Sequence, residues 1–262
     1  MLLDPERVEA RAKDYKRAEI DSGRFRFEKD LSLLGWLVGR TRIVDAGREG
    51  ESEPTQTRTR FTDLAGYAPS PRSIARLPNS IWTKLRFRKQ PLMAKPAPWL
   101  VYDAIAHLES LLTPETRVLE VGGGNSTVWF LHRGVRVTTI ESNPTWAELV
   151  ETRVQSDPDV ISPSNLRLIV RRGAEAIDFI DGLPDGSFDI VLIDSIPERV
   201  VRGPALRAAR PKLKPGGHMV LDNSDSPAHR DALAAMSDKT RTRYSGFTPM
   251  RLRVSQTSFW QV

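Results

Sequence analysis

Apolar residues follow two alternating spacings over the last two-thirds of the chain. Short apolar runs indicate buried strands, and the stretches between them repeat apolar residues at helical spacing. The alternation predicts an α/β, Rossmann-like, doubly wound sheet over residues 96 to 262, with seven strands of which the last two form an antiparallel pair. The predicted strands are 117–121, 135–140, 166–170, 188–193, 217–221, 241–247 and 257–261. The predicted helices are 97–112, 126–132, 144–155, 174–180, 199–210 and 227–236.

The first 95 residues lack this pattern and are predicted to form a mostly helical appendage. Asp4-Pro5-Glu6 is a good helix start, and apolar residues recur at helical spacing as far as Ile20. Residues 31–38 predict a second helix, residues 46–54 have the composition of a loop, and residues 66–98 show no clear period. We expect an appendage of this length to be a lid, a substrate arm or a dimer arm over the catalytic domain.

Composition narrows the class of protein. The chain has 262 residues, enough for one α/β domain with an appendage. It has no cysteine, which excludes disulfides, thiolate metal sites and a cysteine nucleophile. Its longest strongly apolar run, residues 31–39, is shorter than the roughly 18 residues of a membrane span, and its start is unlike a signal peptide. We therefore expect a cytoplasmic protein without a membrane partner.

Charge is unevenly distributed along the chain. Residues 1 to 95 carry 20 lysines and arginines against 13 aspartates and glutamates, whereas residues 96 to 262 carry 19 against 20. A basic appendage suits a nucleic acid, an anionic lipid or a phosphorylated substrate. It is also typical of a solvated surface rich in arginine, which is the interpretation we favour from the sequence.

A strand, a glycine turn and a helix start follow one another near residue 120. The strand leads into Gly122-Gly123-Gly124, and Asn125 and Ser126 can cap the helix that follows. Glycines let a backbone come close to a ligand, and a helix start offers free amides. Glu141 ends the next strand 19 residues after Gly122, the spacing at which an acid reaches a ribose in such folds. The pattern predicts a nucleoside site.

Two residues next to the glycines help to identify the nucleoside ligand. A dinucleotide fingerprint needs a third glycine where Thr127 stands, which argues against NAD and FAD. Glu120 suits a tail that carries an ammonium group better than one that carries phosphates. A glycine turn without any ligand is the remaining alternative.

Acidic and amide side chains follow two later strands. Asp194 comes after the strand 188–193, and Asp222 and Asn223 come after the strand 217–221. Because ligands of open α/β sheets bind at the carboxyl ends of the strands, these side chains should open on one crevice. Two carboxylates and an amide oxygen suit Mg²⁺. Alternatively, Asp194 only contacts the ammonium group of the ligand, and Asp222-Asn223 forms a turn or a helix cap.

The glycine turn resembles motif I of the class I S-adenosylmethionine (SAM)-dependent methyltransferases, and residues 96 to 260 are similar to that fold throughout. The resemblance implies that Glu120 and the glycines hold the methionine end of SAM, and that Glu141 holds the ribose hydroxyls. It also implies that Ala174 and Glu175 lie by the adenine. The predicted cofactor-binding residues are Glu120, Gly122, Gly124, Asn125, Ser126, Thr127, Glu141, Ala174, Glu175 and Asp194.

The acids after the fourth and fifth strands resemble the metal site of the catechol-type O-methyltransferases. This resemblance implies Asp194, Asp222 and Asn223 as ligands of Mg²⁺, which would make a bound hydroxyl more acidic and align it with the methyl group. The lysine expected three residues after Asp194 is replaced by Pro197. The candidates for the catalytic base are therefore Glu198, Asp225 and His229. His229 is preferred because its pKa is ordinarily near neutrality, and its alternative role is that of a surface helix residue.

The acceptor is expected to be a hydroxyl of a small molecule, above all a glycoside. A homodimer is the candidate assembly, and no nucleic-acid partner is expected. The chain is similar to actinobacterial enzymes that methylate mannosides in polysaccharide assembly. Aromatic faces and arginines suit sugars, so the candidate pocket residues are Trp82, Trp99, Tyr102, Arg199 and Arg202. An RNA methyltransferase that uses the basic first segment is the second hypothesis, and a nucleoside-binding regulator without catalysis is the third.

Overall fold

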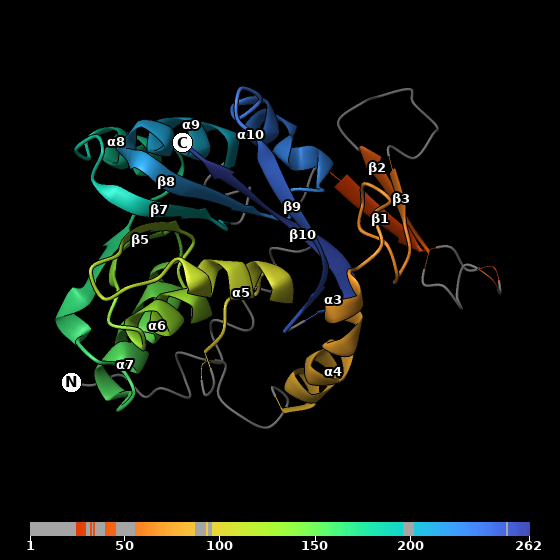
Figure 1. Cartoon of the computed structure of the whole chain (residues 1–262), viewed down its shortest axis with the longest axis horizontal. Helices are drawn as coiled ribbons and strands as arrows, with labels where there is room; N and C mark the ends of the chain where they lie inside the picture. The colour runs from red at the N-terminus through yellow and green to blue at the C-terminus, as the bar shows by residue number, and fades with distance from the viewer. Residues whose placement is uncertain are drawn as a thin grey trace.

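A seven-stranded sheet forms the centre of the protein (Figure 1). The computed structural model describes residues 25–29, 32, 34, 40–45, 56–86, 93, 96–195, 202–249 and 251–262. The strand order is β6-β5-β4-β7-β8-β10-β9; the first five strands of this order pair in parallel, and β10 pairs antiparallel with both β8 and β9. The strands are β4 (Arg117–Val121), β5 (Arg136–Glu141), β6 (Leu166–Val170), β7 (Phe188–Ile193), β8 (Leu213–Asp222), β9 (Arg241–Thr248) and β10 (Arg251–Gln261). The predicted Rossmann-like fold is confirmed.

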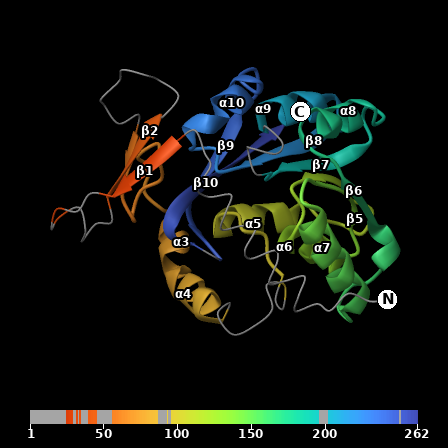
Figure 2. The same cartoon turned by 180° about the vertical axis from the view of Figure 1, so that it is seen from behind.

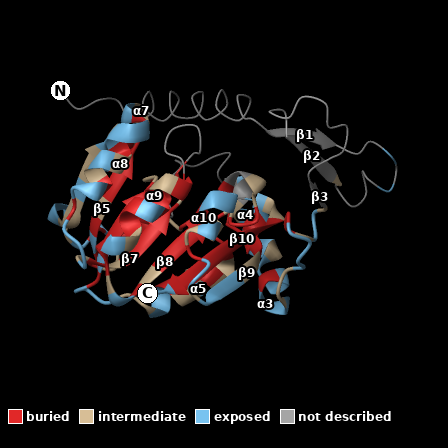
Figure 3. Cartoon of the chain, turned by 90° about the horizontal axis from the view of Figure 1, so that it is seen from above, coloured by how far each residue is buried: buried red, intermediate tan, exposed pale blue. Residues whose placement is uncertain are grey.

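Helices cover both faces of this sheet, which explains why its central strands are continuously apolar (Figures 1 and 3). One face packs on α5 (Tyr102–Ser110), α6 (Asn125–Leu131) and α7 (Pro144–Ser156), and its core includes Leu108, Phe130 and Val150. The other packs on α8 (Gly173–Asp181), α9 (Arg202–Ala209) and α10 (Arg230–Ala234), and its core includes Ile180 and Leu206. Short 3-10 turns lie at Pro163–Asn165, Arg210–Lys212 and Pro227–His229.

The observed elements differ from the predicted ones mainly at their ends. Three strands, 117–121, 166–170 and 188–193, have the predicted bounds. The predicted helix 97–112 begins only at Tyr102, because the two prolines at 96 and 98 disfavour helix before it. β10 begins six residues earlier than predicted, at Arg251, and its first residues pair with β9 alone. The chain therefore continues past the carboxyl end of β8.

The first part of the chain contains strands as well as helices. Where the sequence predicts a mostly helical appendage, the described residues form a small antiparallel sheet of β1 (Phe25–Lys29), β2 (Thr41–Asp45) and β3 (Gln56–Arg58) (Figure 2). Two short helices follow, α3 (Pro71–Ala75) and α4 (Leu77–Arg86), in the stretch without a clear period. The predicted helix that ends at Ile20, the predicted helix 31–38 and the predicted loop 46–54 lie outside the described residues, apart from Ser32 and Leu34. Among the described residues, no helix has the length and apolarity that a membrane span requires.

The helices α3 and α4 lie against β9 through small polar side chains. The Ser73 hydroxyl accepts the amide of Phe247 at 2.7 Å, and the Ser80 hydroxyl donates to the carbonyl of Thr248 at 2.8 Å. A Cβ at Gly246 would lie only 2.1 Å from the Ser73 oxygen. The close approach of this helix pair to the sheet therefore requires a glycine on one side and a serine on the other.

Asp63 is the main polar anchor of the same segment. It is fully buried, and one carboxylate oxygen accepts the amides of Ala65 and Tyr67, both at 2.9 Å. The other oxygen accepts the Ser245 hydroxyl at 2.6 Å and the Gln256 side-chain amide at 2.7 Å. A buried carboxylate with four donors is well satisfied, so Asp63 fixes the turn at residues 59–67 on β9 and β10.

Replacing Asp63 tests this anchor. Asp63→Ala leaves four donors without their acceptor, so the free energy of unfolding should fall by roughly 3 kcal/mol. Urea denaturation measures the change, and Asp178→Ala, an exposed substitution on α8, is the control that should stay within about 0.5 kcal/mol of the parent. Equal stability of Asp63→Ala and the control would show that the segment is not held by this residue.

Candidate active site

The glycine turn joins β4 to α6 at the carboxyl edge of the sheet. Gly122 has φ +98, and a Cβ on it would lie 2.5 Å from the backbone oxygen of Asp194. Beside Gly123 lies Thr139 of β5, and beside Gly124 lies Trp146 of α7. From the sequence, these glycines are predicted to let a ligand approach the backbone. The structure adds that the first of them is needed because the end of β7 passes directly beside it.

Glu120 is a buried acid with one engaged and one unengaged oxygen. Its Oε2 accepts the Thr139 hydroxyl at 2.8 Å and the Thr127 hydroxyl at 2.5 Å. The same Thr127 oxygen accepts the amide of Gly124 at 2.9 Å, so the acid and the turn hold each other in place. Oε1 is buried and has no hydrogen-bond partner among the described residues. Burial raises the pKa of Glu120 to about 7, and the nearby charge of Asp194 adds to this effect.

Glu141 ends β5 beside the turn, as predicted. Its Oε2 accepts the amide of Gly123 at 3.0 Å, and its Oε1 accepts the amide of Asn143 at 2.7 Å and the Ser142 hydroxyl at 3.2 Å. Burial raises the pKa of Glu141 to about 7, although these hydrogen bonds oppose the change. The acid is therefore held at a fixed place and orientation next to the glycine turn.

The start of α6 supplies further buried polar groups. Asn125 is 4% exposed, and neither its amide oxygen nor its amide nitrogen has a hydrogen-bond partner among the described residues. Ser126 and Thr127 are also buried beside it. An unpaired buried amide is costly, and a ligand that hydrogen-bonds to it would remove that cost. The other predicted cofactor residues, Ala174 and Glu175, are exposed in the first turn of α8, after the carboxyl end of β6.

Two acids and one arginine meet beyond β7 and β8. Arg202 is 4% exposed and donates to Asp194 Oδ1 at 3.1 Å, to the carbonyl of Ser195 at 2.7 Å and to the carbonyl of Asp222. Thr257 of β10 donates to Asp222 Oδ1 at 2.8 Å. Burial raises the pKa of Asp222 to about 7, and the charge of Asp194 adds to it. Arg202, a candidate pocket residue in the sequence analysis, thus holds the ends of both strands together.

Asn223 and His229 complete this side of the site. Asn223 has φ +50, a left-handed conformation that asparagine tolerates, and its side-chain nitrogen donates to Ser255 at 2.9 Å. Its carbonyl lies 2.9 Å from Nδ1 of His229. A carbonyl can only accept, so Nδ1 carries the hydrogen and Nε2 has a free lone pair.

His229 is buried rather than on the surface. It is 3% exposed, and Nε2 has no hydrogen-bond partner among the described residues. Burial lowers the pKa of His229 to about 3, and the positive charge of Arg202 contributes. The ring is therefore neutral at physiological pH, with one unprotonated nitrogen that faces no described partner.

The other predicted bases and pocket residues have different surroundings. Asp225 accepts the amide of Leu64 at 2.9 Å, which connects the site to the first part of the chain. Glu198, Pro197 and Arg199 lie outside the described residues. Trp82 is 59% exposed on α4, Trp99 is partly buried, and the hydroxyl of Tyr102 interacts with Ser80 and Thr83 of α4.

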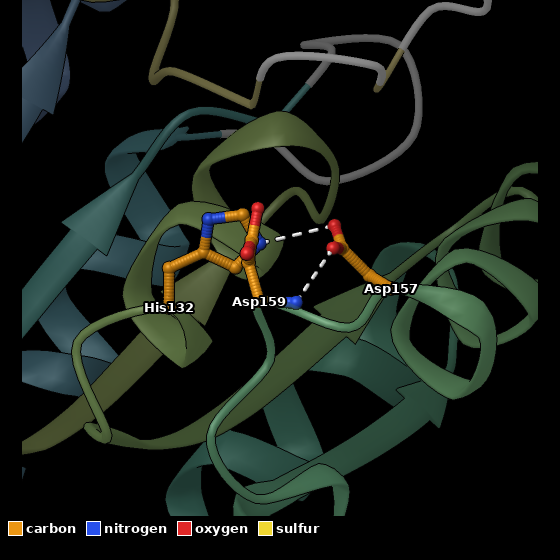
Figure 4. Close-up of side chains that lie close together, drawn as sticks. All are labelled: His132, Asp157 and Asp159. Carbon is orange, nitrogen blue, oxygen red and sulfur yellow. Dashed lines mark hydrogen bonds and ion pairs between the residues drawn. The ribbon is translucent and has the colours of Figure 1, made fainter.

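A separate charged cluster lies where α6 and α7 end, at the edge of the sheet opposite the glycine turn, and Figure 4 shows its three side chains. Candidate ligand atoms of His132, Asp157 and Asp159 lie within 4.8 Å of one another. The carboxylate of Asp157 lies 3.0 Å from Nε2 of His132 and forms an ion pair with Arg153 at 2.8 Å. Because Asp157 is already paired with Arg153 and hydrogen-bonded to His132, we interpret the cluster as a polar network at the C-terminal end of α7.

Comparison with known proteins agrees with this site. Residues 119–224 match the family model described as a methyltransferase domain, and they include the glycine turn, Glu120, Glu141 and Asp222. Together with the strand order, this match defines a methyltransferase domain. The chain is therefore an enzyme of the methyltransferase class. No curated protein matches the chain.

Solved structures resemble the chain more distantly. An O-methyltransferase from Bacillus cereus in complex with SAH gives a TM-score of 0.49 at 17% identity, covering 72% of this chain and 90% of the other. The O-methyltransferase TomG from Streptomyces achromogenes, in complex with SAM, gives 0.49 at 20% identity and covers 71% and 88%. A precorrin 8w decarboxylase from Methanobacterium thermoautotrophicum gives 0.46 at 21% identity and covers 64% and 93%. Likenesses this distant carry no argument about activity.

The raised pKa of Glu120 predicts a pH dependence of stability. Its pKa in the folded protein, about 7, lies above the ordinary 4.5, so the folded state holds the proton more tightly and stability falls as pH rises from about 4.5 through 7. Glu120→Gln removes this titration. The Tm of the parent should fall between pH 5 and pH 8. The Tm of Glu120→Gln should fall less over the same range, and the difference between the two decreases should be about 3 °C or more. Scanning calorimetry at both pH values measures the difference, and Glu151→Gln on the exposed side of α7 should behave like the parent.

Proposed function

We propose that the protein transfers the methyl group of SAM to a hydroxyl oxygen of a small molecule, most naturally a sugar. The observation that carries the proposal is the unprotonated Nε2 of His229, which has no hydrogen-bond partner among the described residues and lies on a ring fixed by the backbone of Asn223. This neutral nitrogen can accept the proton that a hydroxyl loses on methylation. Because the pKa of the ring is about 3, and not near neutrality as expected from the sequence, the transfer requires a hydroxyl whose own pKa is lowered, as the proposed Mg²⁺ would do. His229 lies on the loop after β8, at the same edge of the sheet as the glycine turn.

The residues around the glycine turn fit SAM. Within the part of the chain that the structure describes, Glu120 Oε1 and both amide atoms of Asn125 are buried without a hydrogen-bond partner, and the ammonium and carboxylate of a methionine tail supply complementary groups. Glu141, fixed by three donors, is the acid for the ribose hydroxyls. When bound, SAM supplies an electrophilic methyl group on a sulfonium. The role of the described residues is to orient it and to keep its positive charge close to Asp194 and Glu120.

The residues beyond β7 and β8 fit a hard divalent cation. Asp194 and Asp222 carry negative charge close enough for one to raise the pKa of the other, and Asn223 adds an amide oxygen. We propose that these three residues bind Mg²⁺, which would lower the pKa of an acceptor hydroxyl. Arg202 is then a positioning residue, because it fixes Asp194 and the backbone at 195 and 222.

The first part of the chain is proposed to close the acceptor side of the site. Its turn at residues 59–67 contacts Asp225 through Leu64 and β10 through Asp63. No feature of the described residues favours the alternative of an RNA methyltransferase, since the contacts that this segment makes are with its own catalytic domain. The lid or arm role of residues 1–95 remains part of the proposal.

A methyl-transfer screen tests the reaction and the metal together. We expect methylation of glycosides or phenols that EDTA suppresses and Mg²⁺ restores, and a fall of roughly 100-fold or more in kcat for Asp222→Asn. Manganese binding followed by electron paramagnetic resonance gives a readout without turnover, and Asp222→Asn should lose the bound signal. The control is Asp159→Asn in the cluster at the opposite edge. Full activity in EDTA, or loss of the manganese signal only in Asp159→Asn, would contradict this metal assignment.

His229→Ala tests the base. General-base catalysis contributes about 10²- to 10⁴-fold, so kcat should fall by a factor in that range, while the affinity for S-adenosylhomocysteine stays within about twofold of the parent. Added imidazole should restore part of the activity by occupying the space of the missing ring. An unchanged kcat would show that His229 is not the base. If imidazole does not restore the lost activity, and the loss equals the fraction of unfolded protein, His229 has a purely structural role.

A further inference from the structure

The short helices α3 and α4 concentrate exposed apolar side chains. Of the nine large apolar side chains that are exposed among the described residues, four lie on these two helices. They are Ile74, Ile81, Trp82 and Leu85, with exposed fractions between 43% and 59%. The two helices lie at the periphery of the protein, next to β9 and β10 (Figures 1 and 2). Exposed apolar side chains that gather in one place indicate an interaction surface.

The helix α4 is amphipathic, but its apolar side points away from the protein. The side that faces the sheet carries Ser80, which is buried and donates to the carbonyl of Thr248. At 3.6 residues per turn, Ile81, Trp82 and Leu85 occupy one arc of roughly 100° on the side away from Ser80. A surface helix normally packs its apolar side on the core. Because α4 does the reverse, its apolar side is available for contact with another molecule.

The chain around this apolar side is basic throughout. Residues 64–102 contain seven lysines and arginines and no aspartate or glutamate. All seven precede residue 96, so they account for the whole excess of 20 basic over 13 acidic residues in residues 1 to 95. Two of them, Arg72 and Arg76, are exposed on α3 and directly after it. The partner that this surface fits is therefore both apolar and negatively charged.

We propose that α3 and α4 bind the surface of a membrane that contains anionic phospholipids. Ile81, Trp82 and Leu85 enter the interfacial region of the bilayer, and the basic residues contact the phosphate headgroups. Helices that lie on a bilayer combine Trp and Leu on one side with lysines and arginines, as this segment does. The sequence predicts no membrane partner because no apolar run is long enough to span, but a helix that lies on a bilayer needs only one apolar side.

The apolar side of α4 lies at the same edge of the sheet as the site. β10 is antiparallel to both β8 and β9, so β8 and β9 run in the same direction, and Thr248, which contacts Ser80, ends β9 at the carboxyl edge. Attachment through α4 brings this edge close to the bilayer. The binding itself does not depend on the proposed reaction.

Other partners explain only part of these observations. A second copy of the chain is disfavoured because a twofold-symmetric contact brings this basic face against itself. A solvated arginine-rich surface accounts for the charge but not for the exposed apolar side chains. A nucleic acid also accounts for the charge, but it is bound through phosphate contacts and base stacking rather than through aliphatic side chains such as Ile81 and Leu85.

Sedimentation of the full chain with vesicles tests the proposal without turnover. The parent should bind vesicles of phosphatidylglycerol and phosphatidylcholine at least about tenfold more strongly than vesicles of phosphatidylcholine alone, because each basic residue near an anionic surface contributes roughly a fivefold gain. Ile81→Gln/Leu85→Gln should weaken the binding about tenfold or more. Both positions are exposed, so the fold should persist. Arg72→Gln/Arg76→Gln should weaken binding to the mixed vesicles by roughly tenfold or more.

An exposed apolar residue elsewhere in the chain provides the matched control. Ile161 is 69% exposed next to β6, at the opposite end of the strand order from β9, and Ile161→Gln should bind vesicles like the parent. Because the chain has no cysteine, Leu85→Cys and Ile161→Cys each carry a single environment-sensitive dye. The emission of the dye at position 85 should shift to the blue when mixed vesicles are added, and the emission at position 161 should not change.

Three results would overturn the proposal. The first is a parent that does not bind the mixed vesicles, or binds them no better than phosphatidylcholine alone. The second is equal binding of the parent and Ile81→Gln/Leu85→Gln, or a dye at position 85 that does not respond. The third is a parent that ignores vesicles, is dimeric in analytical ultracentrifugation and becomes monomeric on the same double substitution, which would assign the surface to a second copy of the chain.

Discussion

Negative charge buried at one edge of the sheet is the constraint on which the site depends. Glu120 and Asp222 are each 3% exposed or less, and the charge of Asp194 raises the pKa of both. Among the described residues, Arg202 is the cation that bonds directly to Asp194. Like charges buried together destabilise the ligand-free state. A site built in this way gains stability from any ligand that brings positive charge, as the sulfonium and ammonium of SAM and a divalent cation would.

The backbone keeps these charges close together. β4 and β7 are adjacent parallel strands, the amide of Asp194 donates to the carbonyl of Val121 at 2.8 Å, and Gly122 leaves no room for a side chain between them. A larger residue at 122 would separate the ends of the two strands, and with them Glu120 from Asp194. The glycine turn is thus as much a requirement of the sheet as of the ligand, and the one feature explains both the fold and the position of the acids.

The sequence predicts well what depends on local pattern. The strands 117–121 and 188–193 are recognisable because both of their faces are buried, and Glu120 and Glu141 because they stand at fixed distances from a glycine turn. It does not predict Arg202 as the residue that joins Asp194 to the backbone of Asp222, because those contacts bring together residues up to 20 positions apart through a long, flexible side chain. It places His229 on a helix face, whereas burial and the bond to Asn223 depend on how the loop after β8 packs. The strands β1 to β3 are only three to five residues long, so the alternation of apolar and polar residues in Phe25–Lys29 is too short to distinguish a strand from a loop.

The two halves of the proposed site differ in how they are built. The cofactor side comes from residues 118 to 146, which are neighbours in the sequence, and Thr127, Thr139 and Trp146 hold it together through contacts within that stretch. The acceptor side joins residues that lie more than 150 positions apart, through Asp63 with Gln256 and Leu64 with Asp225. Local contacts form independently of the rest of the chain, but distant ones require the whole fold. A substitution in the first segment should therefore alter which acceptor is methylated before it alters how SAM is bound, because the two sides share the edge of the sheet but not the contacts that hold it.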